Sequence, residues 1–151
     1  MKLEDEIKQN KEFSSEQHKL LVNISYTANW LYNKSEKFFK EHNLTSQQFN
    51  ILRILRGQYP NPSTMKLLRE RMIDKMSDTS RLVDNLFKKD FVIRNICPND
   101  RRQSDVFISE KGLNVLKEID KLIPDFEKKH LSSLSESEMH KLNDLLDKLR
   151  G

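Results

Sequence analysis

The sequence predicts a mainly helical fold with one small β-hairpin, and three observations lead to this prediction. Hydrophobic residues recur at helical spacing over most of the 151 residues. Glycine and proline together number only seven, too few for a loop-rich chain. A strand-like pattern occurs only between residues 91 and 108. The predicted order of elements is therefore α-α-α-α-β-β-α-α.

The first two predicted helices have clear signals. An apolar stripe with the helical period and no interrupting glycine or proline runs from about residue 16 to 42, and it contains Leu20, Ile24, Leu31 and Phe38. This helix is long for a small domain, which favours an element that reaches beyond a single core. Thr45 and Gln48 form a capping-box pattern that begins the second helix. The break from Gly57 to Pro62 ends it.

Two shorter helices follow this break. Ser63 is the predicted cap of a third helix that ends near Arg71. A fourth helix is predicted from about Met76 to Lys89, and its expected inward positions are Met76, Val83, Leu86 and Phe87. Two helices joined by a tight turn are typical of a helix-turn-helix.

The period then changes to that of strands. Residues 91–96 and 104–108 are the predicted strands, and the polar stretch 97–103 is the turn between them. Ser109 is the predicted cap of the next helix, which runs to about Leu122 or beyond, with Pro124 in or beside its later part.

The last helix follows a second capping box, formed by Ser135 and Glu138. Its apolar residues are spaced as in a short coiled-coil seam, and they are Met139, Leu142, Leu146 and Leu149. We therefore expect these four residues to contribute to dimerisation.

The positive charge is concentrated in the middle of the chain. Residues 45–112 contain thirteen Lys/Arg and eight Asp/Glu, whereas residues 1–44 are neutral and residues 113–151 carry a net charge of −1. Eight of the nine arginines lie in this middle segment. Arginine is suited to forked contacts with phosphate and guanine, so duplex DNA is the expected partner. Chance clustering on helical faces is the alternative.

Two groups of polar residues are candidates for contacts with DNA. The start of the fourth helix carries Ser77, Thr79, Ser80 and Arg81, which suit base edges or phosphates in a major groove. Otherwise these residues serve only as caps and surface. The hairpin tip carries Asp100, Arg101 and Arg102, and arginines on a narrow β-ribbon can enter a minor groove. Asp100 can pair with Arg102 and orient it. A solvated turn is the alternative at this tip.

These motifs together resemble the winged helix-turn-helix of the MarR family (multiple antibiotic resistance regulators). The resemblance covers residues 44–116 and rests on four segments in the family's order: Leu44-Thr45 with Gln48-Phe49 and Leu52, Ser80–Leu86, Asp100-Arg101-Arg102, and Ile108–Gly112. Each segment is weak alone, and the flanking helices match only by layout. The chain is accordingly divided into an N-terminal dimerisation region (1–43), a DNA-binding lobe (44–112) and C-terminal dimerisation helices (113–151).

The resemblance implies an intertwined homodimer whose recognition helices enter successive major grooves of a pseudo-palindrome while the wings reach the minor grooves. By resemblance, Ser80 and Arg81 belong to the recognition helix, and Asp100 and Arg102 form the wing pair. The sequence departs from the family at Asp90, where glycine is usual. Aspartate tolerates the left-handed conformation better than most residues, so the turn is expected to survive.

Effector binding is less well marked in the sequence. Tyr26, Trp30 and Asn33 share a helix face and could line a pocket for a small aromatic effector, although packing against the core or the partner chain is the favoured interpretation. Cys97, the only cysteine, is interpreted as a packing residue rather than a redox sensor. The four dispersed histidines, His18, His42, His130 and His140, show no metal-ligand spacing, so no metal or cofactor is expected.

The predicted function is that of a cytoplasmic bacterial transcriptional regulator, a repressor that a small ligand releases from its operator. No run of about 18 apolar residues is present, so no membrane association is expected. An enzyme is disfavoured because the chain lacks a glycine-rich phosphate loop, a nucleophile elbow and a metal motif. The alternative is a winged-helix module for protein–protein contacts, which would not need arginines at both the recognition helix and the wing.

Overall fold

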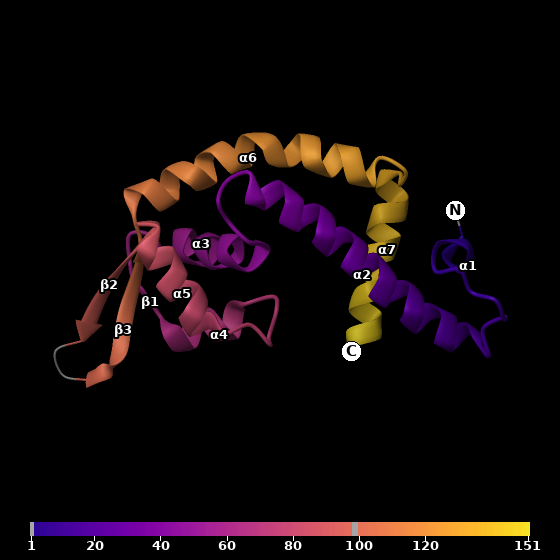
Figure 1. Ribbon diagram of the computed structural model, residues 1–151, viewed down its shortest axis with the longest axis horizontal. Coiled ribbons are helices and arrows are strands. Elements are labelled where there is room, and N and C mark those ends of the chain that lie inside the picture. Colours follow the sequence, from indigo (N-terminus) through magenta and orange to yellow (C-terminus); the bar gives the residue numbers. More distant parts are fainter. Residues whose placement is uncertain (1, 98–99) are drawn as a thin grey trace.

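The computed structural model describes residues 2–97 and 100–151, and the side chains of residues 2–95 and 104–151 (Figure 1). Its helices are α1 (Leu3–Glu6), α2 (Glu16–Lys40), α3 (Ser46–Gln58), α4 (Met65–Arg71), α5 (Thr79–Lys88), α6 (Glu110–Leu131) and α7 (Glu136–Arg150). The strands are β1 (Ser63–Thr64), β2 (Val92–Cys97) and β3 (Asp100–Ile108). The predicted mainly helical fold is confirmed, with α1 and β1 as elements that the sequence pattern did not indicate.

Side-chain caps begin the longer helices, as the sequence predicts. Thr45 and Gln48 form both halves of a capping box at α3, and Ser135 and Glu138 do the same at α7. The Ser109 hydroxyl accepts a hydrogen bond from the Gly112 amide at the start of α6. Each cap satisfies amide groups that have no partner within the helix.

Three predictions about the helix-turn-helix are wrong. Ser63 does not cap α4; it lies in β1, and the Thr64 hydroxyl accepts the bond from the Leu67 amide instead. The fourth helix begins at Thr79 rather than near Met76, because the Asp78 carboxylate caps it. Met76 therefore precedes the helix and is 93% exposed, and Phe87 is also exposed, although both were expected to face inward.

The sheet has three antiparallel strands in the order β1-β3-β2. Val92 pairs with Ile108 and Ser63 pairs with Val106, so the hairpin is joined to the start of α4 through β1. The predicted turn over 97–103 is too long, because β3 already begins at Asp100. Asp90 precedes β2 and has a φ of 61°, the left-handed conformation expected of the residue that replaces glycine.

One core unites the lobe that contains the helix-turn-helix. It joins the end of α2, helices α3, α4 and α5, the sheet and the start of α6, and its fully buried members include Ile51, Leu52, Leu68, Val83, Leu86, Val106 and Leu116. Gly112 lies against the turn before β2, where an added Cβ atom would stand 2.3 Å from the Phe91 carbonyl oxygen. The start of α6 is thereby fixed to the base of the hairpin.

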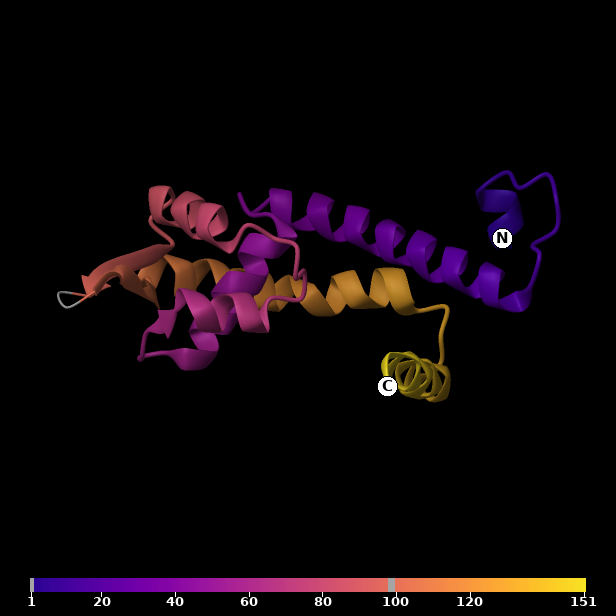
Figure 2. The same ribbon diagram turned by 90° about the horizontal axis from the view of Figure 1, so that it is seen from below.

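The remaining helices extend away from this lobe. Helix α6 arches away from the hairpin, and α7 turns off from the end of α6 at a steep angle to it (Figures 1 and 2). Helix α2 extends further than α6, to the end of the molecule where α1 lies (Figures 1 and 2). Helix α6 is continuous across residue 112, where the sequence division placed a boundary. Helix α7 has no buried residue in the single chain. In the described part of the chain, no helix is long and apolar enough to span a membrane.

Candidate nucleic-acid interface

The first turn of α5 presents a small polar surface. Ser80 and Arg81 are exposed there, and Ser77 is half-buried just before the helix. Thr79 is only 3% exposed, so its side chain packs within the lobe and does not belong to this surface. Helix α5 has no acidic residue in its first turn, and the Asp78 carboxylate that precedes it is engaged by the Arg81 amide. Ser80 and Arg81 are therefore the accessible pair among the four predicted residues.

Hydrogen bonds hold the turn before α5 in one conformation. The Ile73 amide donates to Asn50 Oδ1 on α3 at 2.9 Å, and the Met76 amide donates to Asp74 Oδ1 at 3.0 Å. The Ser77 hydroxyl and then the Met76 amide lower the pKa of Asp74, because both stabilise its carboxylate. The turn that presents α5 is thus fastened to α3 through Asn50 and held internally by the Asp74 carboxylate.

The other end of α5 is held by Lys89. Its ammonium group donates to the Asn43 carbonyl at 2.7 Å and to Gln48 Oε1 at 3.0 Å, which joins the end of α5 to the capping box of α3. Burial lowers the pKa of Lys89, since removal from water disfavours the charged form. Both ends of α5 are therefore anchored on the same neighbouring helix.

Arg94 connects the hairpin to the outer face of α5. Its guanidinium group forms an ion pair with the Asp84 carboxylate and lies 5.8 Å from the centre of the Phe87 ring. A second arginine, Arg56 on α3, forms two hydrogen bonds with Asp120 on α6, the shorter at 2.5 Å. These two members of the arginine-rich segment have partners within the chain, and sequence spacing gave no sign of either pairing.

Asp100, Arg101 and Arg102 form the start of β3. Their backbone therefore lies at the end of the hairpin that points away from the lobe (Figure 1). The side chains of these three residues lie outside the described part of the structure, as does the predicted pairing of Asp100 with Arg102. Cys97, whose side chain also lies outside the description, ends β2 and pairs through its backbone with Asp100.

A small cavity of about 230 Å³ lies beside the turn before α5. Its mostly apolar wall comes from α2, α3 and that turn, and includes Tyr32, Gln47, Asn50, Met72, Ile73 and Asp74. The Ser46 hydroxyl, also in the lining, is buried without a hydrogen-bond partner. A partly apolar pocket with a few converging polar groups is the usual form of a small-molecule site.

The residues predicted to line an effector pocket lie elsewhere on α2. Tyr26 is half-buried, whereas Trp30 and Asn33 are exposed in the single chain. The Trp30 ring meets the His130 ring of α6 edge-to-face, with 5.8 Å between their centres. None of the three lines the cavity beside the turn.

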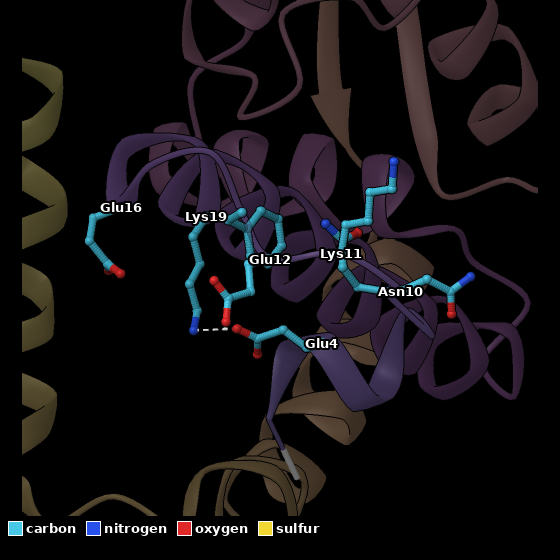
Figure 3. Close-up of a pocket in the computed structure, with 8 residues that line it drawn as sticks. Glu4, Asn10, Lys11, Glu12, Glu16 and Lys19 are labelled. Atoms are coloured by element: carbon cyan, nitrogen blue, oxygen red, sulfur yellow. Dashed lines mark ion pairs between the residues drawn. The ribbon is translucent and has the colours of Figure 1, made fainter.

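A second hollow, of about 420 Å³, lies far from α5 at the N-terminal end of α2 (Figure 3). Glu4 of α1 and Lys19 of α2 form an ion pair of 2.5 Å beside it, which lowers the pKa of Glu4 and raises that of Lys19. The charged groups around this hollow include both signs, so it offers no selective anion site. Among the described residues, no three His, Cys, Asp or Glu side chains gather as metal ligands.

Comparison with known proteins identifies the lobe. The MarR family model matches residues 44–104. The chain is 30% identical to the HTH-type transcriptional regulator MgrA of Staphylococcus aureus over 142 residues, which are 89% of this chain and 92% of MgrA. It is 25% identical to the regulator MhqR of Bacillus subtilis over 134 residues, which are 87% of this chain and 89% of MhqR.

Solved structures share the fold over nearly the whole chain. A MarR-like transcription regulator from Bacillus cereus has a TM-score of 0.79 at 24% identity, with 89% of this chain and 96% of that chain covered. A mutant E. coli MarR complexed with operator DNA has a TM-score of 0.75 at 21% identity and covers 99% of both chains. An organohalide-sensing regulator bound to 2,4-dichlorophenol has a TM-score of 0.81 at 21% identity, with 94% of this chain and 86% of that chain covered. This chain is a transcriptional regulator of the MarR family.

Proposed function

We propose that the protein is a repressor that binds a pseudo-palindromic operator as a homodimer. The observation that carries the proposal is the exposure of Ser80 and Arg81 on a helix whose two ends are anchored to α3 and whose outer face is joined to the hairpin through Arg94. Such a rigid helix suits entry into a major groove. The operator-bound E. coli structure has the same fold, which supports this mode of binding.

The proposed interface has two parts on each subunit. Ser80 and Arg81 contact the major groove, whereas the buried Ser77 hydroxyl supports the turn before them. Arg101 and Arg102 of the wing reach the adjacent minor groove with Asp100 as an orienting partner. Residues 44–112 form the lobe that carries both parts. The positive charge of that segment supplies the attraction to phosphate.

The proposed dimer uses the helices outside this lobe, residues 1–43 and 113–151. Helix α7 buries none of its residues in the single chain, although Met139, Leu142, Leu146 and Leu149 lie along one side of it. Leu20, Leu21 and Leu31 of α2 and Leu122 of α6 are also exposed. A second copy would remove this apolar surface from water. Two recognition helices related by a two-fold axis predict half-sites about 10 bp apart.

Release by a small effector is part of the proposal, and the cavity beside the turn supports it. The volume of about 230 Å³ exceeds the roughly 150 Å³ of an engineered cavity that binds benzene, so there is room for one aromatic ring. Among its described lining residues Asp74 is the one charged group, and its pKa is lowered. A neutral or cationic ring with a hydrogen-bond donor is therefore favoured over a carboxylate. Tyr26, Trp30 and Asn33 remain the alternative location.

The experiment is selection of bound sequences from a random duplex pool, followed by binding measurements on the selected site. Arg81→Ala should cost about 1–3 kcal/mol on this site and less on random duplex if Arg81 reads a base. Arg102→Ala should weaken binding with little change in stability. Arg150→Ala, outside the lobe, is the matched control and should bind like the wild type.

Three results would change the proposal. An unenriched pool would favour the alternative function, a winged-helix module for protein contacts. Wild-type affinity in Arg102→Ala would remove the wing from the interface, and equal losses of Arg81→Ala on both duplexes would make Arg81 a phosphate contact.

A further inference from the structure

Met76 is a large apolar side chain in an unusual place. It lies two residues before the N-cap of α5 and is 93% exposed. A single exposed apolar residue needs no explanation by itself. This one, however, lies in the turn that leads directly into Ser80 and Arg81 at the start of α5, which we propose enters the major groove. Ile73, earlier in the same turn, is also exposed.

The backbone presents Met76 on a fixed support rather than on a loose loop. Its amide donates to Asp74 Oδ1, the Ser77 amide donates to the Asp74 carbonyl at 3.3 Å, and the preceding Ile73 amide is held by Asn50 of α3. Asp78 then caps α5 through the Arg81 amide. Because the turn is ordered before binding, a contact made by Met76 would lose little free energy to ordering the backbone.

The chemistry of the side chain restricts what it can read. A thioether has no donor and is only a weak acceptor, so it cannot satisfy the polar edges of guanine, cytosine or adenine. Thymine is the base that offers an apolar group in the major groove, its 5-methyl. Arg71 and Lys75, which flank this turn, are exposed cations that favour a nearby phosphate backbone.

We infer that Met76 is a specificity-determining residue that packs on the 5-methyl group of a thymine in each half-site, beside the bases contacted from the first turn of α5. This inference rests on the proposed function. It adds an apolar contact to an interface that is otherwise made of polar side chains. The helical pattern of the sequence does not indicate this contact, because it predicts Met76 to face the core.

The test replaces each thymine of the selected operator, symmetrically in both half-sites, by deoxyuridine, which lacks only the methyl group. One replacement should weaken wild-type binding about fourfold, the effect of burying roughly one methyl group. The same replacement should have no effect on Met76→Ala, whereas Met76→Leu should keep the sensitivity. Ile93→Ala is the matched control, since Ile93 is an apolar residue of β2 that lies outside this turn and is 51% exposed, and it should leave the sensitivity unchanged.

Three results would overturn the inference while leaving operator binding intact: a half-site without thymine, a Met76→Ala protein with the full sensitivity to deoxyuridine, or no sensitive thymine in the wild type. Failure of the wild type to bind any duplex would instead overturn the proposed function. Thermal unfolding of each variant distinguishes a lost contact from a lost fold, and Met76→Ala should unfold like the wild type because its side chain is almost fully exposed.

Discussion

The Arg94 guanidinium group on β2 pairs with the Asp84 carboxylate on α5, and this ion pair links the hairpin to the proposed recognition helix. The Arg94 side chain is 29% exposed, and the Asp84 side chain is 51% exposed. The pair thus lies between the two elements that we propose contact DNA. Its energetic contribution to folding is small by the standard of partly exposed ion pairs.

Asp84→Asn should therefore separate affinity from stability. We expect a loss of less than about 1 kcal/mol in the free energy of unfolding, but a larger loss in operator affinity, because the wing is no longer held relative to α5. Denaturant unfolding and duplex titration measure the two. Asp147→Asn, which breaks an exposed ion pair with Arg150 outside the lobe, is the control. Equal, small losses in both quantities would show that the pair does not position the wing.

Gly112→Ala should destabilise the protein strongly. The new Cβ atom would stand 2.3 Å from the Phe91 carbonyl oxygen and 2.8 Å from Ile108 Cγ1, so the backbone must shift. We expect a cost of about 1–3 kcal/mol in the free energy of unfolding. Gly57→Ala is the control, because nothing lies within 4 Å of its Cβ position and alanine favours a helix over glycine by up to about 1 kcal/mol. Equal effects would contradict the close approach at α6.

The stability of the protein should fall in acid partly through Asp74. Its pKa is lowered in the folded state, so the carboxylate contributes stability above the unfolded-state pKa and loses it as the pH falls through the folded-state pKa. Unfolding of wild type and Asp74→Asn from pH 7 to pH 3 measures this contribution. The variant should lose less stability over the same interval, and parallel curves would show that the turn does not depend on this charge.

The pair of substitutions Leu142→Asp and Leu146→Asp should convert the proposed dimer to monomers. Both residues lie on the apolar side of α7, which is not buried in the single chain, and a dimer would bury the new carboxylates at high cost. Sedimentation velocity measures the result. Lys141→Asp with Lys148→Asp, off that stripe on the same helix, should remain dimeric. A dimer in the leucine variant would place the interface elsewhere.

Local signals in the sequence predicted most of the fold. The capping boxes at Thr45 and Ser135 act within one helical turn, so they could be read directly from residue spacing. The sequence pattern wrongly predicts Ser63 as a helix cap, because its actual partner in the sheet, Val106, is far along the chain. No local pattern distinguishes a cap from a two-residue strand that exists only through such a distant pairing.

The sequence predicts only part of the candidate site, because the rest also depends on contacts between distant segments. Ser80 and Arg81 follow from the start of a polar helix, and the structure leaves them exposed. The burial of Thr79 and the exposure of Met76 depend on where the Asp78 cap begins α5, three residues later than the apolar pattern indicated. The Arg94–Asp84 pair depends on how the hairpin folds back on α5, which residue spacing alone does not determine.

The salt dependence of duplex binding tests the central claim most directly. Affinity for the selected operator should fall about 10³–10⁵-fold between roughly 50 and 200 mM salt if 6–10 phosphates are contacted, and the slope should be shallower for Arg102→Ala. An affinity that hardly changes with salt, or the absence of duplex binding at low salt, would contradict the claim that the start of α5 and the arginine-bearing wing together contact DNA.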